Sequence, residues 1–184
     1  MLARPGLLRI AKETGDTVFL TVRANNNSIC AEREIGDFPI KTLVVEVGDL
    51  RPLGIGSGSL AILSALPDAE IQRLLVHNAQ ALKAFPRFNR DEMLQHIAAT
   101  RTRSYSLIDG QLVAGMSAIG VVIRDPAGQA IAAISVASIA PRLEGTRLDS
   151  IVDLVRGEAA QLEQTLIATQ RRLPEQAMRA RAAA

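Results

Sequence analysis

A segment rich in glycine and serine, residues 53–61, has the composition of a binding site for a small anion. It reads LGIGSGSLA, and a compact apolar run that predicts a helix, residues 60–66, begins inside it. Glycine lets the backbone approach a ligand closely, and the first turn of a helix offers free N–H groups and the positive end of the helix dipole. Both features favour a carboxylate or another small anion. A tight loop whose glycines only permit close packing would explain the same pattern, and both interpretations stand at this point.

The segment lacks the signatures of nucleotide-binding loops. No Gly-Lys-Ser or Gly-Lys-Thr follows it, as a Walker loop requires, and Ser59 stands where a GxGxxG fingerprint needs its third glycine. We therefore expect no nucleotide and no other cofactor here.

A second candidate is a strand with one small face, predicted at residues 132–138. Its two alternating sets of side chains are Ile134, Val136 and Ser138 on one face, and Ala133, Ser135 and Ala137 on the other. The small face leaves room either for a closely packed helix or for a ligand cavity. Ser135 and Ser138 fall on opposite faces, so at most one of them can line any single cavity.

Residues suited to catalysis are scarce. The chain has two histidines, His77 and His96, both on predicted helices among solvated residues, and we expect both at the surface. Its single cysteine, Cys30, lies in a predicted strand and is expected to be a core thiol. No GxSxG nucleophile elbow and no metal-ligand spacing is present. We predict no enzyme, no catalytic residue and no metal site.

These candidate sites would be positioned by one sheet and several helices. Periodicity predicts a short helix ending at Thr14 and Gly15, strands at 16–24, 29–35 and 41–47, helices at 60–66, from 68 and from 89, strands at 105–109, 117–124 and 129–138, and a long helix from Leu148. The strands form two groups of three and do not alternate singly with helices. The sequence therefore predicts the α+β class, an antiparallel sheet with helices packed on its faces.

Length and composition fit one domain with its own core: 184 residues, of which 48% are hydrophobic and 22% charged. The net charge of +2 and an aromatic content of 3% supply neither a dense basic face nor a stacking platform, so we expect no direct contact with DNA. No apolar run approaches the roughly 20 residues of a membrane span, and the N-terminus lacks a signal peptide's apolar region. We expect a cytoplasmic protein with no membrane partner and a flexible tail at 174–184.

Five short motifs, in order, resemble the C-terminal effector domain of the IclR family of bacterial transcription regulators. They are TGDTV at 14–18, VGDLRPL at 47–53, GSGSLAIL at 56–63, YSL at 105–107 with GMSAIGV at 115–121, and AAISV at 132–136 followed by Pro141 and Arg142. The second motif is similar to the family's VGxRxPL with one residue displaced around its arginine. The order and spacing of the motifs, over nearly the whole chain, carry the resemblance.

The resemblance implies a curved antiparallel sheet of the GAF-like or profilin-like kind. It also implies an N-terminal winged helix-turn-helix domain, which this chain does not contain. Residues 1–15 would be the end of an interdomain linker helix, and residues 16–173 the effector-binding domain. Such a regulator would form a homo-oligomer, a dimer or tetramer, and would reach operator DNA only through the missing domain.

In the family, small carboxylates bind where the glycine-rich helix start meets the last two strands. Carried over by position, the resemblance places the ligand site at Gly56, Ser57, Gly58, Ser59, Leu60, Ile108, Ala118, Ser135 and Ala137. Four of these lack a hydrogen-bonding group common in the family: Ile108 (commonly acidic), Leu60 (lysine), Ala118 (cysteine) and Ala137 (serine). The added apolar space predicts an effector larger or more apolar than a two- or three-carbon acid, such as an aromatic or medium-chain carboxylate.

The alternative is a dimerisation module whose pocket has collapsed and which binds no small molecule. The lost polar groups are compatible with it. A cavity between residues 56–60 and Ser135 would distinguish the sensor from this module.

Overall fold

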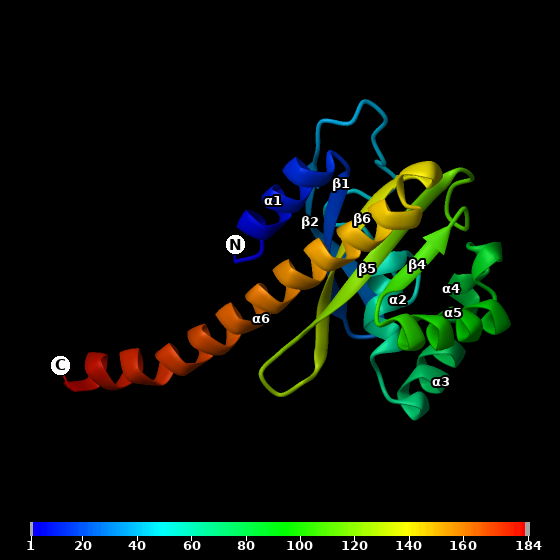
Figure 1. Cartoon of the computed structure of the whole chain (residues 1–184). Coiled ribbons are helices and arrows are strands. Elements are labelled where there is room, and N and C mark those ends of the chain that lie inside the picture. Colours follow the sequence, from blue (N-terminus) through cyan, green and yellow to red (C-terminus); the bar gives the residue numbers. More distant parts are fainter. Residues whose placement is uncertain (1, 183–184) are drawn as a thin grey trace.

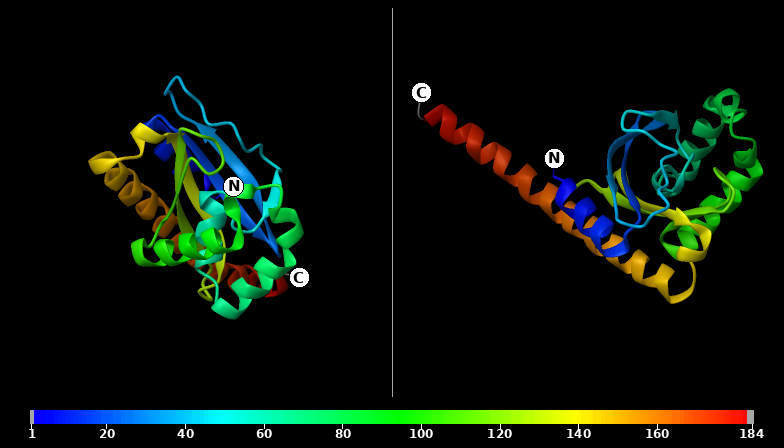
Figure 2. Two further views of the ribbon diagram at one scale, coloured as in Figure 1. Left: turned by 90° about the vertical axis from the view of Figure 1, so that its right-hand side faces the viewer. Right: turned by 90° about the horizontal axis from the view of Figure 1, so that it is seen from above.

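One six-stranded sheet organises the molecule. The computed structural model describes the backbone of residues 2–182 and the side chains of residues 2–170. The strands are β1 (Thr17–Ala24), β2 (Asn27–Ile35), β3 (Leu50–Pro52), β4 (Ser106–Asp109), β5 (Met116–Arg124) and β6 (Ala130–Ile139). Their order is β3-β2-β1-β6-β5-β4 and every neighbouring pair is antiparallel, so each group of three forms a meander and the groups join at β1 and β6. The antiparallel sheet with its helices confirms the predicted α+β class, and the sheet is curved (Figure 2), as the resemblance implied.

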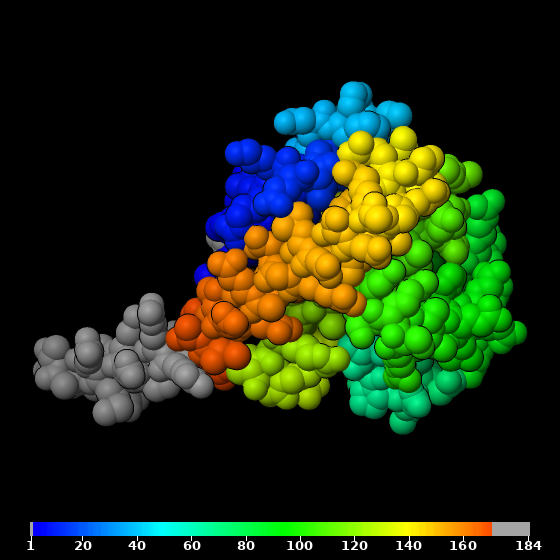
Figure 3. Space-filling view, in the orientation of Figure 1, coloured from blue at the N-terminus to red at the C-terminus, as the bar shows by residue number. Residues whose placement is uncertain are grey.

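Helices cover both faces of the sheet (Figure 1). On one face lie α1 (Arg4–Thr14) and α6 (Gly145–Ala182), side by side in the space-filling view of Figure 3. On the other lies α2 (Ser57–Ser64), with α3 (Asp68–His77), α4 (Ala79–Leu82) and α5 (Arg90–Arg103) around it. Two 3₁₀ turns, η1 (Pro86–Phe88) and η2 (Ala140–Arg142), precede α5 and α6.

The alternation predicted for the first strand is confirmed. Val18 and Leu20 belong to the apolar core beneath α1 and α6. Phe19 faces the opposite side, where it packs with Cys30 and Ala137. The long helix is confirmed as well, since Ile151, Val152 and Val155 are buried in the first core.

Helix α2 is buried on all sides, and the hydroxyls of Ser59 and Ser64 within it are hydrogen-bonded. Gly120 on β5 allows its close approach, because a Cβ there would lie 2.7 Å from the carbonyl oxygen of Ser57. Ala133, from the small face of β6, is fully buried in the core beside α2. The small face therefore does receive a closely packed helix along part of its length.

Two boundaries differ from the sequence prediction. The strand expected at residues 41–47 is absent; this stretch belongs to an irregular connection, the 36–49 loop, and the third strand is Leu50–Pro52. The period-two apolar pattern was misleading because Leu43 and Val47 point into solvent, with 47% and 57% of their surface exposed. Helix α2 begins at Ser57 and not at Leu60, because Gly56 adopts φ 91° and ends the preceding turn there.

Other boundaries agree with expectation. Asn89 caps α5 by accepting a hydrogen bond from the backbone N–H of Glu92, at 3.0 Å. Asp125 begins the β5–β6 turn, where Gly128 takes φ 81°. Helix α6 extends past the edge of the sheet (Figure 1). Its bounds include most of residues 174–184, the segment expected to be a flexible tail. Residues 183 and 184 lie outside the described residues. The division at residues 15 and 173 stays a prediction.

Candidate functional site

A cavity of about 70 Å³ lies between the first turn of α2 and the sheet. Seven of the nine predicted site residues line it: Gly56, Ser57, Gly58, Ser59, Ala118, Ser135 and Ala137. The remaining two, Leu60 and Ile108, are buried in the apolar core around α2 and do not line it. Because the helix begins at Ser57, Leu60 comes after its first three residues and turns toward that core.

Sequence reasoning missed the part of the lining that comes from the first three strands, from the loops next to them and from the β4–β5 connection. These residues are Phe19, Thr21, Ser28, Cys30, Val44, Val45, Asp49, Arg51, Ile55 and Leu112. The alternation of β1 and β2 was a signal for Phe19 and Cys30, since both face α2. Arg51 lies inside the VGDLRPL motif, but no spacing rule assigned it a role.

A short hydrogen-bond relay holds the glycine-rich turn in place. The hydroxyl of Ser28 donates to Oγ of Ser59, at 2.8 Å, and the backbone N–H of Gly54 donates to the same oxygen, also at 2.8 Å. Ser59 Oγ accepts both bonds, so only its own O–H is left to contact a ligand.

Three other hydroxyls remain available around the cavity. Those of Thr21, Ser57 and Ser135 make no hydrogen bond with the described part of the chain, and all three residues line the cavity. A Cβ on Gly58 would lie 2.6 Å from Oγ1 of Thr21 and 3.3 Å from Oγ of Ser135. Both hydroxyls thus sit directly against the first turn of α2, where a ligand would meet its free N–H groups.

The 36–49 loop covers the cavity through Val44 and Val45. Two arginines from the sheet hold it there: Arg51 donates to the carbonyl oxygen of Val44, and Arg33 donates to that of Val45 at 2.9 Å. These carbonyl groups are therefore satisfied by side chains and not by a strand ladder, which explains the irregular backbone.

One positive and one negative side chain line the cavity, and the negative one offsets part of the positive charge. Arg51 and Asp49 both line it, and their Nη2 and Oδ2 atoms lie 3.8 Å apart. The first turn of α2 adds the positive end of a helix dipole. Burial raises the pKa of the Cys30 thiol, so Cys30 contributes a neutral, weakly polar surface and no thiolate.

The cavity is small in this conformation. An engineered cavity of about 150 Å³ accommodates benzene, and the volume here is about 70 Å³. A larger effector would require the 36–49 loop to move outward.

The histidines lie away from the cavity. His77 is exposed on α3, as predicted. His96 is half-buried on α5 and not on the surface as expected; its Nε2 lies 3.4 Å from Nε2 of Gln111, and burial lowers its pKa. Within residues 2–170, no group of three or more His, Cys, Asp or Glu side chains gathers as a metal site would require. No described helix is long and apolar enough to cross a membrane.

Comparison with known proteins identifies the family to which this chain belongs. The family model described as bacterial transcriptional regulator IclR C-terminal matches residues 1–164. The chain therefore belongs to the IclR family. The relatives that match it are transcriptional regulators and not enzymes.

Two individual relatives agree with this family assignment. The HTH-type transcriptional regulator KipR of Bacillus subtilis is 26% identical over 166 residues, covering 90% of this chain and 66% of that protein. The HTH-type transcriptional repressor AllR of Salmonella typhimurium is 27% identical over 171 residues, covering 90% of this chain and 61% of AllR. The chain thus spans less than two thirds of these relatives' length.

Solved structures share the fold. The IclR protein of Thermotoga maritima superposes with a TM-score of 0.77 at 21% identity, covering 90% of this chain and 67% of that one. The repressor BlcR of Agobacterium tumefaciens gives a TM-score of 0.75 at 25% identity, covering 90% of this chain and 65% of that one.

Proposed function

We propose that this chain is the effector-sensing domain of a transcription regulator and that its cavity binds a small carboxylate. The observation that carries the proposal is the convergence of three free hydroxyls, those of Thr21, Ser57 and Ser135, on the first turn of α2. A carboxylate at this place would accept hydrogen bonds from the N–H groups of the turn and from the hydroxyls. Arg51 would add a positive charge at the cavity wall.

The rest of the cavity suits an apolar body. Phe19, Ala118 and Ala137 line it, and Ala118 pairs directly with Ala137 across β5 and β6. The volume supports a compact effector while the 36–49 loop is closed. The aromatic or medium-chain carboxylate expected from sequence requires an open loop and stays a prediction.

A DNA-binding part outside this chain completes the proposal. The relatives named above are helix-turn-helix regulators by name, and they are longer than this chain. Helix α1 would be the end of the connection to that part. We also propose a homo-oligomer, a dimer or tetramer, in which the effector biases one of two arrangements of the DNA-binding parts.

The test is a thermal-shift screen against carboxylic acids, from glyoxylate and pyruvate to benzoates and phenylacetates. One class of acid should raise the melting temperature. Ser135→Leu, which fills the cavity, should abolish the shift, and Ser135→Ala, which removes only the hydroxyl, should reduce it. The melting temperatures of the free variants control for stability.

The second candidate is a dimerisation module without a ligand. The cavity expected of a sensor is present between residues 56–59 and Ser135, but its volume of about 70 Å³ keeps this candidate open. For this module no acid, even well above millimolar concentration, would shift the melting temperature. The protein would still dimerise in sedimentation experiments, and Ser135→Leu would leave its oligomeric state unchanged.

A further inference from the structure

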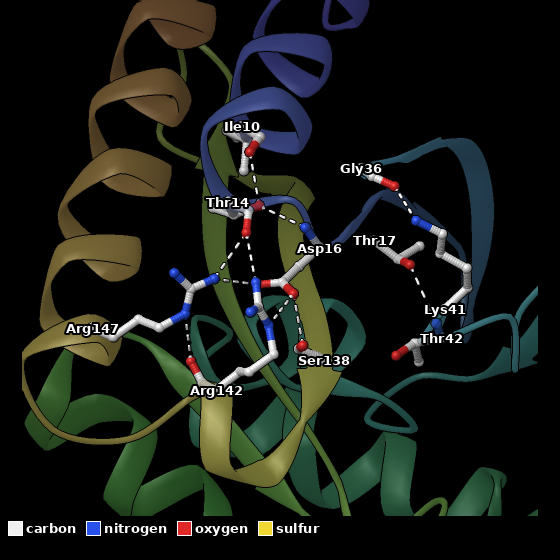
Figure 4. Close-up of polar contacts among 10 residues, drawn as sticks. All are labelled: Ile10, Thr14, Asp16, Thr17, Gly36, Lys41, Thr42, Ser138, Arg142 and Arg147. Atoms are coloured by element: carbon white, nitrogen blue, oxygen red, sulfur yellow. Dashed lines mark hydrogen bonds and ion pairs between the residues drawn. The ribbon is translucent and has the colours of Figure 1, made fainter. Parts of the chain in front are cut away.

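A fully buried carboxylate lies where α1 passes into β1. The side chain of Asp16 has no exposed surface. Its Oδ1 accepts hydrogen bonds from Ser138 Oγ at 2.7 Å and from Arg142 Nε at 2.9 Å, and its Oδ2 accepts one from Arg147 Nη2 at 2.8 Å (Figure 4). The charge is thus paired on both oxygens, as burial demands.

The same two arginines hold the end of α1. The carbonyl oxygen of Thr14, the last residue of the helix, accepts hydrogen bonds from Nη2 of Arg142 at 2.9 Å and from Nη2 of Arg147 at 2.8 Å. Positive charge at a helix C-terminus is favourable. Arg142 and Arg147 therefore perform matched roles toward Asp16 and Thr14.

The 36–49 loop begins on this junction. Gly36 N donates to the carbonyl oxygen of Asp16 at 3.0 Å, and Phe38 N donates to that of Gly15 at 2.8 Å. The contact is so close that a Cβ on Gly36 would lie 2.2 Å from the carbonyl carbon of Gly15. Farther along, Thr42 N donates to Thr17 Oγ1 at 3.3 Å (Figure 4).

Arg142 makes a further contact, with this loop. The guanidinium carbon of Arg142 lies 3.7 Å from the centre of the Phe38 ring, a close cation–π contact. Arg147 instead donates through Nε to the carbonyl oxygen of Arg142. The loop that starts at Phe38 continues to Val44 and Val45, which cover the cavity.

We propose that Arg142 is a positioning residue for the 36–49 loop, which forms the cover of the cavity. The guanidinium of Arg142 contacts Phe38 in this loop and also binds Asp16 and Thr14, so it couples the cover to helix α1. This inference deepens the proposed function and rests on it for its biological meaning. When the 36–49 loop moves outward to admit an effector, Phe38 leaves Arg142, and the end of α1 loses a constraint. Displacement of α1 loosens the cover by the same linkage.

The reactivity of the Cys30 thiol measures opening of the 36–49 loop, the cover, without any effector. Cys30 is the only cysteine of the chain. Its backbone N–H donates to the carbonyl oxygen of Asp49, and its own carbonyl oxygen accepts from Gly48 N, so the end of the loop is fastened over it. The residue is 4% exposed, so a thiol reagent reaches it only when the cover opens.

The experiment measures the rate of Cys30 labelling by a thiol reagent under native conditions in Arg142→Ala, Arg147→Ala and Phe38→Leu. Arg142→Ala and Phe38→Leu should label about tenfold faster than the unsubstituted protein, as expected for the loss of a strong cation–π contact. Arg147→Ala, which removes matched bonds to Asp16 and Thr14 but no cation–π contact with Phe38, should label more slowly than Arg142→Ala and Phe38→Leu. Phe38→Leu leaves the Asp16 cluster intact, so it keeps the test valid if Arg142→Ala folds poorly.

Hydrogen exchange supplies the second readout. Arg142→Ala should accelerate exchange both at the amides of Gly36 and Phe38 and in the last turn of α1, whereas Arg147→Ala should do so only in α1. Equal labelling rates in the Arg142 and Arg147 variants, or an unchanged rate in Phe38→Leu, would overturn the proposal. Neither measurement uses an effector, so a negative result here can be told apart from a negative result in the effector screen.

Discussion

The hydroxyl of Ser28, on β2, donates a 2.8 Å hydrogen bond to the hydroxyl of Ser59, in the first turn of α2. Ser59 also receives the N–H of Gly54, so one buried oxygen ties a strand, a glycine turn and a helix together. The geometry of the cavity depends on these two bonds, because they fix the turn that precedes α2.

Ser59→Ala should destabilise the protein by about 1–3 kcal/mol, since it leaves the Gly54 N–H and the Ser28 hydroxyl buried without their partner. Urea unfolding followed by circular dichroism measures the change. The matched control is Ser64→Ala in the same helix, because the Ser64 hydroxyl bonds only to the carbonyl oxygen of Leu60 one turn earlier. Similar losses for both variants would contradict the role given to Ser59.

Gly120→Ala should cost about 1–3 kcal/mol, because the added methyl group would lie 2.7 Å from the carbonyl oxygen of Ser57 and would push α2 off the sheet. Gly157→Ala in α6 is the control, since a Cβ there meets nothing within 4 Å. In an open helical position alanine is favoured over glycine by about 1 kcal/mol. The two substitutions should therefore change the free energy of unfolding in opposite directions; a stable Gly120→Ala protein would argue against close packing of α2.

Arg51→Gln should weaken the binding of the carboxylate found in the screen by about tenfold, because it removes a positive charge from the cavity wall. The corresponding neutral amide should bind the two proteins alike. Arg33→Gln is the control: it also releases a carbonyl group of the 36–49 loop, that of Val45, but Arg33 does not line the cavity. Isothermal titration calorimetry measures the affinities, and equal losses in both variants would assign the effect to the loop and not to the charge.

His96 should make the protein less stable in acid. Burial lowers the pKa of His96 in the folded state below the ordinary value of 6.5, so the unfolded chain takes up the proton first. The free energy of unfolding therefore decreases as the pH falls from 6.5 through the folded-state pKa. His96→Gln should remove this part of the slope, whereas His77→Gln, at an exposed position, should retain it. Urea titrations between about pH 7.5 and pH 5.5 measure both; identical slopes in the two variants would refute the assignment to His96.

The sequence predicted the fold where periodicity reports burial. Val18 and Phe19 face opposite cores because side chains alternate along a strand, and Asn89 caps its helix because a short acceptor satisfies a free N–H group. The same logic failed at residues 41–47. There the apolar spacing matched a strand. However, Arg33 and Arg51 donate hydrogen bonds to the carbonyl oxygens of Val45 and Val44, which a neighbouring strand would otherwise bind.

The candidate site was predicted in part. The family motifs located seven residues of the cavity, because the glycine turn and β6 are continuous stretches of sequence. Arg51 and the 36–49 loop were missed, since their position depends on long-range hydrogen bonds. The contact of Arg142 with Asp16 joins residues 126 positions apart, and no local pattern specifies it.

The pairing at the centre of the sheet has a consequence for how the chain reaches this structure. β1 meets β6, and the bond from Ser138 to Asp16 closes a separation of 122 residues. The hairpin of β1 and β2 is synthesised well before β6, so the other edge of β1 lacks its partner strand until Ala130–Ile139 has been made. Until then the edge of β1 stays open to other nascent chains. Pairing across so long a separation predicts slow folding.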